Sequence, residues 1–499
     1  MSGLMMQPSW QVKVTPAEIV SPAGVVPEWA VGWERWLRTA GVAPGAPFLL
    51  SPMFEYDTRL NGFFQSGRVR SLAPRTQLGY ARDLAAFLTF LWSARGATRW
   101  IDATEPDHIA YLFWRRHDPA GPCVAGATWN RELAAVNQFY RWALWAGHLQ
   151  THPIPQQSVR SGVRRAGWAT AASLDEQRPA TFARNVGSGR VRWLPAASYR
   201  RWRDVGVRGF TAEGELDSRF RGRWAARNAA FCDLMVRTGL RLGEQAALVL
   251  SELPLLSGGR GGYQRFWLPE AIAKGGSART VYVPDAVVTD LLAYVECDRA
   301  DVVVQARAVG RYARVRRPLV LDERGTTATQ TLVSGSARQV KVAHLSAEQR
   351  ERLFVETDGG LEPAALWLGE YGMPLSPARW KAMFTEANAR CSRAGIDLAA
   401  HAHLLRHSFA VITLEQLQRG HLAALAELSE QQRGHYVRVF GDPLDWVRRR
   451  LGHRSVVTTQ IYLDTLAELE MQTRMALVPD EWPDPRNSAI DEQHNEVVL

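Results

Sequence analysis

The sequence has few cysteines and no long apolar run, and both shortages narrow the class of protein. Its 499 residues include four scattered cysteines and no Cys-x-x-Cys pair. This argues against a zinc site and a disulfide framework and favours a reducing compartment. No stretch of about 18 apolar residues occurs, and the first residues do not resemble a secretory signal. We therefore expect a cytoplasmic protein without a membrane partner.

Acidic residues are scarce relative to basic ones. The chain has 60 Lys and Arg against 50 Asp and Glu, a formal net charge of +10. Between Arg160 and Arg227, fifteen arginines stand against six acids, with four tryptophans among them. An arginine-rich, acid-poor stretch is typical of a nucleic-acid partner, although a solvated basic surface is the alternative.

Apolar periodicity divides the chain into segments. Residues 76–92, 106–116 and 128–147 repeat apolar side chains at helical spacing, so we expect a small all-helical domain. The predicted segments are an irregular N-terminal arm, 1–60, with one short helix near 29–40; the helical DNA-binding domain, 61–155; a basic linker, 156–194; a catalytic domain, 195–477; and a polar tail, 478–499.

The catalytic domain combines helices with one hairpin. Two strand-like runs, 264–268 and 280–283, flank a Gly275-Gly276 turn. Two poorly patterned stretches near 308–365 and 415–440 are expected to be insertions. The predicted helices cover 223–238, 285–307, 376–394, 403–414, 443–450 and 464–475.

Cationic side chains recur at turns and helix starts in this domain. Arg241 follows a glycine stop, and Glu244, three residues on, can brace its guanidinium. An arginine fork matches phosphate oxygens in a way that lysine does not. Lys274 lies at the mouth of the predicted hairpin, where it could protonate a leaving oxygen. Taken singly, a pair such as Arg241 and Glu244 is usually a surface ion pair, and a lysine such as Lys274 usually lies in a solvated turn.

Two further motifs lie towards the C-terminus. In the motif His403-Leu-Leu-Arg406-His407, the side chains of His403 and Arg406 are one helical turn apart, so both can contact one phosphate. The two histidines also have a metal-ligand spacing, but no Asp or Glu accompanies them, so we predict no metal and no cofactor. Tyr462 follows His453 by nine residues. A tyrosine with a pKa near 10 needs a base or nearby cations to act as a nucleophile.

Together these motifs resemble the tyrosine recombinase, or phage integrase, family. The resemblance covers roughly 70–155 and 195–475 and includes the segment Arg75-Thr76-Gln-Leu-Gly-Tyr80-Ala-Arg82. It implies a mainly α fold with a small antiparallel β-sheet, a SAM-like core-binding domain and a C-shaped DNA clamp. It assigns the six catalytic positions to Arg241, Lys274, His403, Arg406, His453 and Tyr462, with Glu244 and His407 as supporting residues.

The resemblance also implies a reaction. Two arginines grip the scissile phosphate, Tyr462 attacks it to leave a 3′-phosphotyrosyl enzyme, Lys274 protonates the 5′ oxygen, and His403 is the candidate base. The implied partners are double-stranded DNA recombination sites and three further copies in a tetramer, with accessory bending or directionality proteins. The predicted DNA-contacting residues are Arg75, Thr76, Tyr80, Arg82, Arg164, Arg165 and Arg279.

Three alternatives remain. A type IB topoisomerase uses a similar set of residues, a DNA-binding regulator would bind without cleaving, and a telomere resolvase would form hairpins. The spacings depart from compact family members: Lys274 and His403 are 129 residues apart, and Arg406 and His453 are 47 apart. Both excesses coincide with the poorly patterned stretches. The insertions and the arm favour integration or excision of a mobile element in the bacterial nucleoid.

Overall fold

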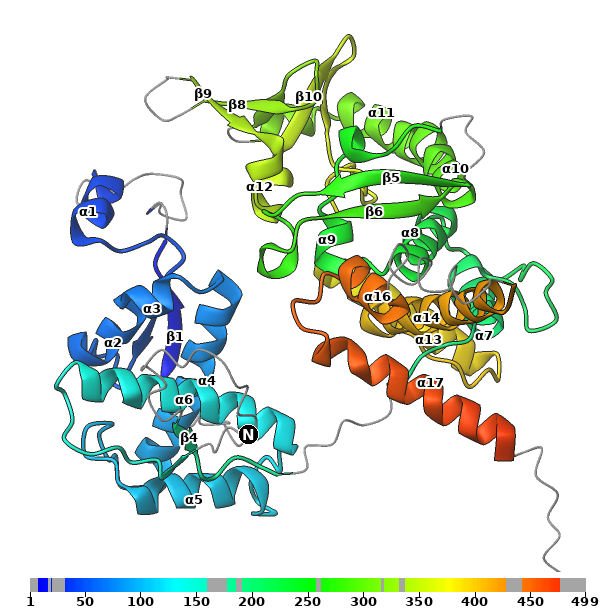
Figure 1. Cartoon of the computed structure of the whole chain (residues 1–499). Coiled ribbons are helices and arrows are strands. Elements are labelled where there is room, and N and C mark those ends of the chain that lie inside the picture. The colour runs from blue at the N-terminus through cyan, green and yellow to red at the C-terminus, as the bar shows by residue number, and fades with distance from the viewer. Residues whose placement is uncertain are drawn as a thin grey trace, which may run out of the picture. The chain divides into compact units, whose positions relative to one another are not determined.

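The protein divides into two compact units, Met1–Gly187 and Ser188–Leu499 (Figure 1). The computed structural model describes residues 8–16, 19, 32–158, 177–184, 191–256, 262–315, 318–331, 337–427 and 442–475. None of the helices in these ranges is long and apolar enough to cross a membrane.

The first unit is built on helices. Its elements are β1 (Gln11–Val14), α1 (Trp33–Ala40), β2 (Pro47–Leu50), α2 (Thr58–Gln65), α3 (Gly67–Arg70), α4 (Pro74–Ala94), α5 (Glu105–Arg116), α6 (Gly126–Trp145), β3 (Gln156–Ser158) and β4 (Gln177–Pro179). Proline occupies the first turn of α4, where its missing N–H costs nothing. Asp107 accepts a hydrogen bond from the Thr104 amide and so caps α5. The three predicted helices, α4, α5 and α6, are confirmed.

Among the described residues before 60, the chain is not an irregular arm, and that prediction was wrong, whereas the short helix expected near residues 29–40 is present as α1. β1 pairs antiparallel with β2, and Leu49 and Leu60 are fully buried in the helical core. The side chain of Asn61 binds both the amide and the carbonyl of Leu49, at 2.7 and 2.9 Å. Because these backbone groups are buried, they need hydrogen-bond partners, and the Asn61 side chain supplies the bonds that a neighbouring strand would otherwise make.

The predicted linker 156–194 also belongs partly to the first unit. β3 pairs with β4, and Thr181 then accepts a hydrogen bond from the Trp129 indole at 2.8 Å and contacts His108. The boundary between the units therefore falls near Gly187 rather than residue 155.

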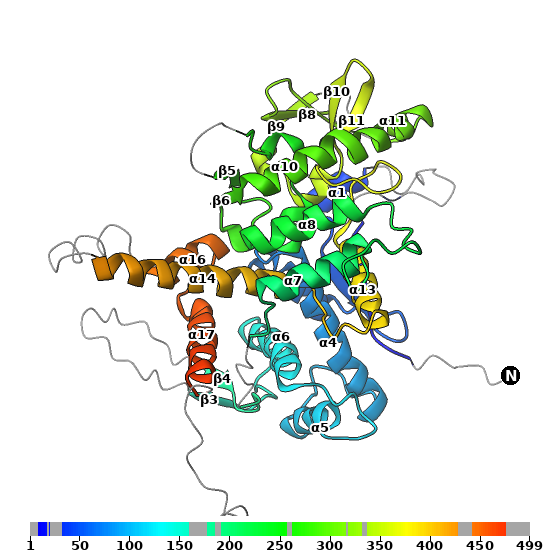
Figure 2. The ribbon, with the colours of Figure 1, turned by 90° about the vertical axis from the view of Figure 1, so that its right-hand side faces the viewer.

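The second unit surrounds a hairpin with helices. β5 (Tyr263–Leu268) and β6 (Arg279–Pro284) form the predicted antiparallel sheet, whose inner face packs into the largest core. α14 packs against α8, α16 and α17 (Figure 2). The helices are α7 (Ala196–Trp202), α8 (Ala225–Thr238), α9 (Leu242–Ala246), α10 (Asp285–Tyr294), α11 (Ala300–Ala308), α12 (Ala347–Arg350), α13 (Pro377–Arg393), α14 (Ala402–Glu427), α16 (Pro443–Leu451) and α17 (Val457–Met475).

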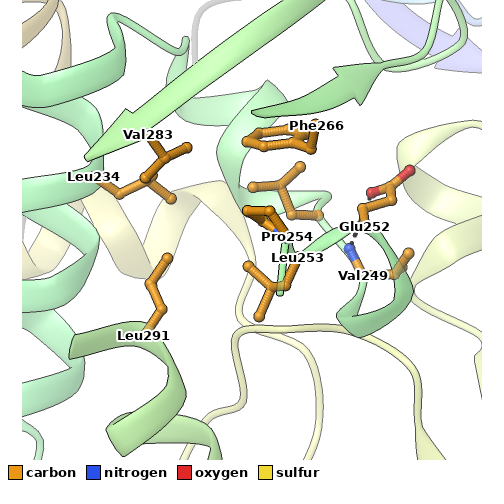
Figure 3. Close-up of a pocket in the computed structure, with 9 residues that line it drawn as sticks. Leu234, Val249, Glu252, Leu253, Pro254, Phe266, Val283 and Leu291 are labelled. Carbon is orange, nitrogen blue, oxygen red and sulfur yellow. Dashed lines mark hydrogen bonds between the residues drawn. The ribbon is translucent and has the colours of Figure 1, made fainter. Parts of the chain in front are cut away.

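An apolar pocket lies behind the hairpin (Figure 3). Its walls include Leu234, Phe266, Val283 and Leu291, and its single charged group, Glu252, is already paired with a buried arginine at 2.8 Å. The pocket offers no unpaired charged group to a polar ligand, so it belongs to the core.

The stretch 308–365 contains a second sheet that the sequence did not predict. Its strands are β7 (Leu319–Leu321), β8 (Thr327–Thr331), β9 (Ala337–Lys341), β10 (Leu353–Thr357) and β11 (Gly360–Pro363). Their order is β11-β10-β7-β8-β9, and only β7 and β10 are parallel.

Two helices are longer than predicted. α14 continues from Ala402 to Glu427, so the first part of the expected insertion 415–440 extends this helix. α17 begins at Val457 rather than 464, which places Tyr462 inside the helix. Residues 428–441 and the predicted tail, 478–499, lie outside the described residues.

Candidate active site

A glycine turn presents Arg241 at the start of a helix. α8 ends at Gly239, whose φ of 66° is left-handed, and Arg241 precedes the first turn of α9. The Arg241 amide donates to Glu244 Oε2 at 3.0 Å, and its guanidinium donates to Oε1 at 2.9 Å. The predicted bracing of Arg241 by Glu244 is present in the structure.

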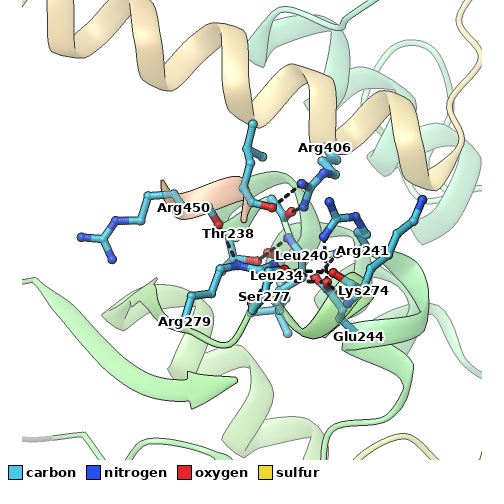
Figure 4. A network of polar contacts seen from close by, with 12 residues as sticks. Leu234, Thr238, Leu240, Arg241, Glu244, Lys274, Ser277, Arg279, Arg406 and Arg450 are labelled. Carbon is cyan, nitrogen blue, oxygen red and sulfur yellow. Dashed lines mark hydrogen bonds and ion pairs between the residues drawn. The ribbon is translucent and has the colours of Figure 1, made fainter. Parts of the chain in front are cut away.

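Glu244 is a buried hub for several donors. Its side chain is 2% exposed and also binds Arg279 at 2.6 Å and the Lys274 amide at 3.2 Å. Burial alone would raise the pKa of this carboxyl, but hydrogen bonds and charge from Arg279 and Arg241 lower it to about 2. Glu244 is therefore an anion that joins three cationic segments (Figure 4).

Arg406 fastens two helix ends from the buried side of α14. It is 1% exposed, and its guanidinium donates to the carbonyls of Gly239 and Leu451, at the ends of α8 and α16. Burial and the nearby Arg241 lower its pKa. Both residues line the same hollow of about 480 Å³. An anion entering there would meet the two positive charges.

Tyr462 lies against the histidine cluster. Its hydroxyl is 2.9 Å from His407 Nδ1, and its ring stacks on His453 with centroids 6.4 Å apart. The side chain is 1% exposed, and burial raises its pKa although Arg406 and Arg241 oppose the rise. The phenol is therefore neutral and covered in this arrangement.

The histidines differ in their contacts. His453 Nδ1 lies 3.0 Å from the Thr459 hydroxyl, and the His403 ring lies 4.3 Å from that of His407. Burial, followed by the charge of His403 and Arg406, lowers the pKa of His407 to about 4. Burial and Arg406 lower the pKa of His403. The histidine within hydrogen-bond distance of the tyrosine hydroxyl is thus His407, which the sequence ranked as supporting, and not His403, the predicted base.

The hollow brings together four of the six predicted catalytic residues. Lys274 is exposed at its rim, and His403, Arg241 and Arg406 also line it. The sequence missed Lys381 and Thr385, which are exposed on one face of α13 and line the same hollow. Their spacing of four residues places them on one helix face, but no motif distinguishes that face from an ordinary solvated one.

The predicted DNA-contacting residues fall into four groups, of which the fourth is Arg279 alone. Arg75, Thr76 and Arg82 are exposed on α4, with the two arginines seven residues apart on one face. Tyr80 is half-buried and packs against the core of the first unit, so much of its surface is already covered. Arg164 and Arg165 lie outside the described residues.

The prediction that Arg279 contacts DNA needs correction. The residue is 7% exposed, and its guanidinium is paired with Glu244. A signal for this was present: in β6 the side chains of Arg279, Val281 and Val283 all face inward, in the two-residue alternation of a strand.

Metal binding remains a matter of prediction. Within the described ranges, no three His, Cys, Asp or Glu side chains gather closely enough to hold a metal ion. His403 and His407, at metal-ligand spacing, instead stack edge to face.

Known proteins resemble both parts of the chain. Residues 62–147 match the phage integrase, N-terminal SAM-like domain. The chain is 22% identical over 393 residues to the tyrosine recombinase XerC of Lactobacillus delbrueckii subsp. bulgaricus, covering 79% of this chain and 89% of the relative. The tyrosine recombinase XerC of Bradyrhizobium diazoefficiens is 28% identical over 193 residues, covering 38% of this chain and 49% of that relative.

Among solved structures, the Tn1549 transposon integrase in complex with a circular intermediate DNA is similar over 83% of this chain and 99% of that one, at 11% identity and a TM-score of 0.45. Residues 62–147 thus form a SAM-like domain of the phage integrase type. The chain is similar to a tyrosine recombinase along most of its length, and the resemblance predicted from its motifs is confirmed.

Proposed function

We propose that this protein is a site-specific DNA recombinase that cuts and rejoins strands through a 3′-phosphotyrosyl intermediate at Tyr462. The observation that carries the proposal is the 2.9 Å contact between the Tyr462 hydroxyl and His407, beside the buried charge of Arg406. A tyrosine becomes nucleophilic where a base can take its proton and cations offset the phenolate charge.

The arginines would act on the phosphate. Arg241 and Arg406 would bind the non-bridging oxygens and stabilise the charge of the pentavalent transition state. Lys381 and Thr385 line the same hollow and would bind a neighbouring phosphate. Since Tyr462 is covered here, binding of DNA must bring the phenol out of its buried position before it can attack.

Proton transfer follows from the contacts. Neutral His407, as the group nearest the phenol, would accept its proton through Nδ1, while the adjacent His403 contacts the phosphate. Lys274, at the rim of the hollow, would protonate the departing 5′ oxygen. The new phosphodiester to tyrosine conserves the energy of the broken bond, so rejoining needs neither ATP nor a metal.

The biological setting is part of the proposal. We propose that the two units together enclose duplex DNA, that four copies assemble on paired recombination sites, and that the reaction integrates or excises a mobile element.

The test uses nicked duplexes from the DNA that flanks the gene, with EDTA present and a denaturing gel as the readout. The wild type should form a covalent adduct, and Tyr462→Phe should not. Tyr312→Phe is the matched control, because Tyr312 is 3% exposed and its hydroxyl makes one hydrogen bond, to Gly372, away from the site.

The outcomes separate the alternatives. An adduct with Tyr462→Phe would refute the assignment of the nucleophile. Specific binding without cleavage by any variant would favour a DNA-binding regulator. Relaxation of a supercoiled plasmid without strand exchange would favour a topoisomerase, and hairpin ends would favour a telomere resolvase.

A further inference from the structure

Arg279 has an unusual set of partners for a residue in a strand. Its guanidinium binds Glu244 at 2.6 Å and donates through Nε to the Arg450 carbonyl at 2.9 Å and through Nη1 to the Ser277 carbonyl at 3.3 Å. Arg279 therefore links β6 to α9, to the end of α16 and to the hairpin turn (Figure 4).

The turn that carries Lys274 is held by its backbone. The Lys274 amide donates to Glu244 at 3.2 Å, the Gly275 carbonyl accepts from Arg454, and the Ser277 carbonyl accepts from Arg279. The Lys274 side chain is exposed, and its ammonium is carried by a flexible chain of four carbons. Where its ammonium can reach is thus set by the position of the turn.

Arg279 acts on this turn in two ways. It binds the turn directly at Ser277, and it neutralises Glu244, the anion that binds the turn at Lys274. Without Arg279, the carboxylate of Glu244 would keep Arg241 as its one charged partner at a site that is 2% exposed. Loss of one partner of a buried pair is costly, because the remaining charge lacks both water and its counterion.

Lysine cannot replace this arginine. The three acceptors, Glu244, Arg450 and Ser277, lie in different directions, and the planar fork of a guanidinium reaches all of them. A lysine would keep the charge next to Glu244 but offers one nitrogen in place of three.

We propose that Arg279 is a positioning residue that holds the Lys274 turn where its ammonium meets the leaving 5′ oxygen. This inference rests on the proposed function, in which Lys274 is the acid. It assigns to Arg279 no contact with DNA.

The test compares two scissile phosphates. In the normal substrate the Tyr462 oxygen bonds to phosphorus, the P–O5′ bond breaks, and the alkoxide takes a proton. In a substrate with bridging sulfur at the 5′ position, the P–S bond breaks and a thiolate leaves with the electron pair, so no acid is needed. The ratio of cleavage rates, sulfur over oxygen, therefore reports how well Lys274 delivers its proton.

Lys274→Ala should cleave the oxygen substrate slowly and recover on the sulfur substrate. Arg279→Lys should follow the same pattern, with a ratio at least about tenfold above wild type, which is less than the roughly 10²–10⁴-fold that general acid catalysis contributes, because the acid is misplaced and not removed. Arg279→Gln is the second variant, in case the first folds poorly. Thermal unfolding of each variant is measured alongside, because the ratio is read only on folded protein.

Arg299→Lys is the matched control. Arg299 is 3% exposed, and its guanidinium donates to the carbonyls of Pro363 and Ala365 in another part of the unit. Arg299→Lys, like Arg279→Lys, replaces a buried arginine. The ratio of sulfur to oxygen cleavage rates should nevertheless stay at the wild-type value.

Two results would overturn the inference. If sulfur rescues Lys274→Ala but neither Arg279 variant, Arg279 does not position the acid, and the proposed function stands. If sulfur does not rescue Lys274→Ala, Lys274 is not the acid, and the inference falls together with that part of the proposed function.

Discussion

At the scale of single residues, Arg241 and Arg406 have the same charge but different exposure. The Arg241 side chain is 22% exposed and faces the hollow, whereas Arg406 is buried and bonded to two carbonyls. A phosphate can therefore meet Arg241 with little rearrangement. Replacement of Arg406 would disturb the ends of two helices as well as the chemistry, so Arg241 gives the cleaner test.

Arg241→Gln should slow adduct formation by about 10²–10³-fold, the usual loss for one electrostatic contact in a transition state. Single-turnover rates on a nicked duplex measure this. Arg221→Gln removes one charge from an exposed arginine that donates to Ser218 and should leave the rate near wild type. Equal losses in the two variants would point to general attraction of DNA.

His407 predicts an unusual pH dependence. Burial, His403 and Arg406 lower its pKa to about 4, so the imidazole stays neutral, and able to accept a proton, at every pH above that value. Free imidazole titrates near pH 6.5. Single-turnover cleavage should therefore show no loss between pH 7 and 5.5. An acid limb centred near 6.5 would mean that His407 does not take the proton of Tyr462.

At the scale of elements, the turn between α8 and α9 holds both Arg241 and the Gly239 carbonyl that Arg406 binds. Gly239 has φ of 66°, and a Cβ there would lie 2.4 Å from Phe409 of α14. Gly310 has a similar φ of 63° but open space around it. The two glycines thus separate backbone strain from crowding.

Gly310→Ala should lower the free energy of unfolding by about 1 kcal/mol, the strain of a left-handed alanine. Gly239→Ala should add the cost of displacing Phe409, another 1–3 kcal/mol or so for crowding in a packed core. Urea unfolding measures both variants. If both variants lose the same free energy of unfolding, then Phe409 of α14 can move away from the added methyl group at no measurable cost.

The same elements show what the sequence could predict. The motifs predicted the six catalytic candidates. They also predicted that Glu244 braces Arg241, because a spacing of three residues on a helix fixes the geometry of this pair. The contact between His407 and Tyr462 joins residues 55 apart, and no local pattern reports it. The buried position of Arg279 was readable from strand alternation, but its charge suggested the surface instead.

The second sheet was missed for a different reason. Its strands have three to five residues, too few for a clear alternation, and β7 pairs in parallel with β10 across an intervening hairpin. Similarly, β1 and β2 are short, and their place in the core depends on Asn61, a polar residue that sequence patterns count as exposed.

At the scale of the whole molecule, acid should destabilise the fold. Burial lowers the pKa of His108 to about 4, and that of His152 likewise. Between pH 6.5 and 4 the unfolded chain binds more protons at these residues, so stability is full above 6.5 and is lost as pH falls towards 4. His108, which is 1% exposed, could account for up to about 3 kcal/mol.

Urea midpoints measured from pH 7 to 4.5 test this. They should fall with pH, and His108→Gln should make the dependence shallower. A dependence unchanged in that variant would mean that His108 is protonated in the folded unit.

The proposed enclosure of duplex DNA by both units predicts a strong effect of salt. A protein that contacts six to ten phosphates shows a slope of log affinity against log salt of roughly −5 to −9. Titrations of a labelled recombination site at salt concentrations between about 50 and 200 mM measure this slope. Over that interval the affinity should fall by about 10³–10⁵-fold. A slope near zero would contradict the enclosure.

The most direct test of the central claim is to identify the amino acid that becomes joined to DNA. The adduct formed on a nicked duplex is digested with nuclease and protease, and the peptide that retains a nucleotide is sequenced by mass spectrometry. The account predicts a peptide from α17 with a 3′-nucleotide on Tyr462. A nucleotide on any other residue, or one linked through a 5′-phosphate, would contradict it.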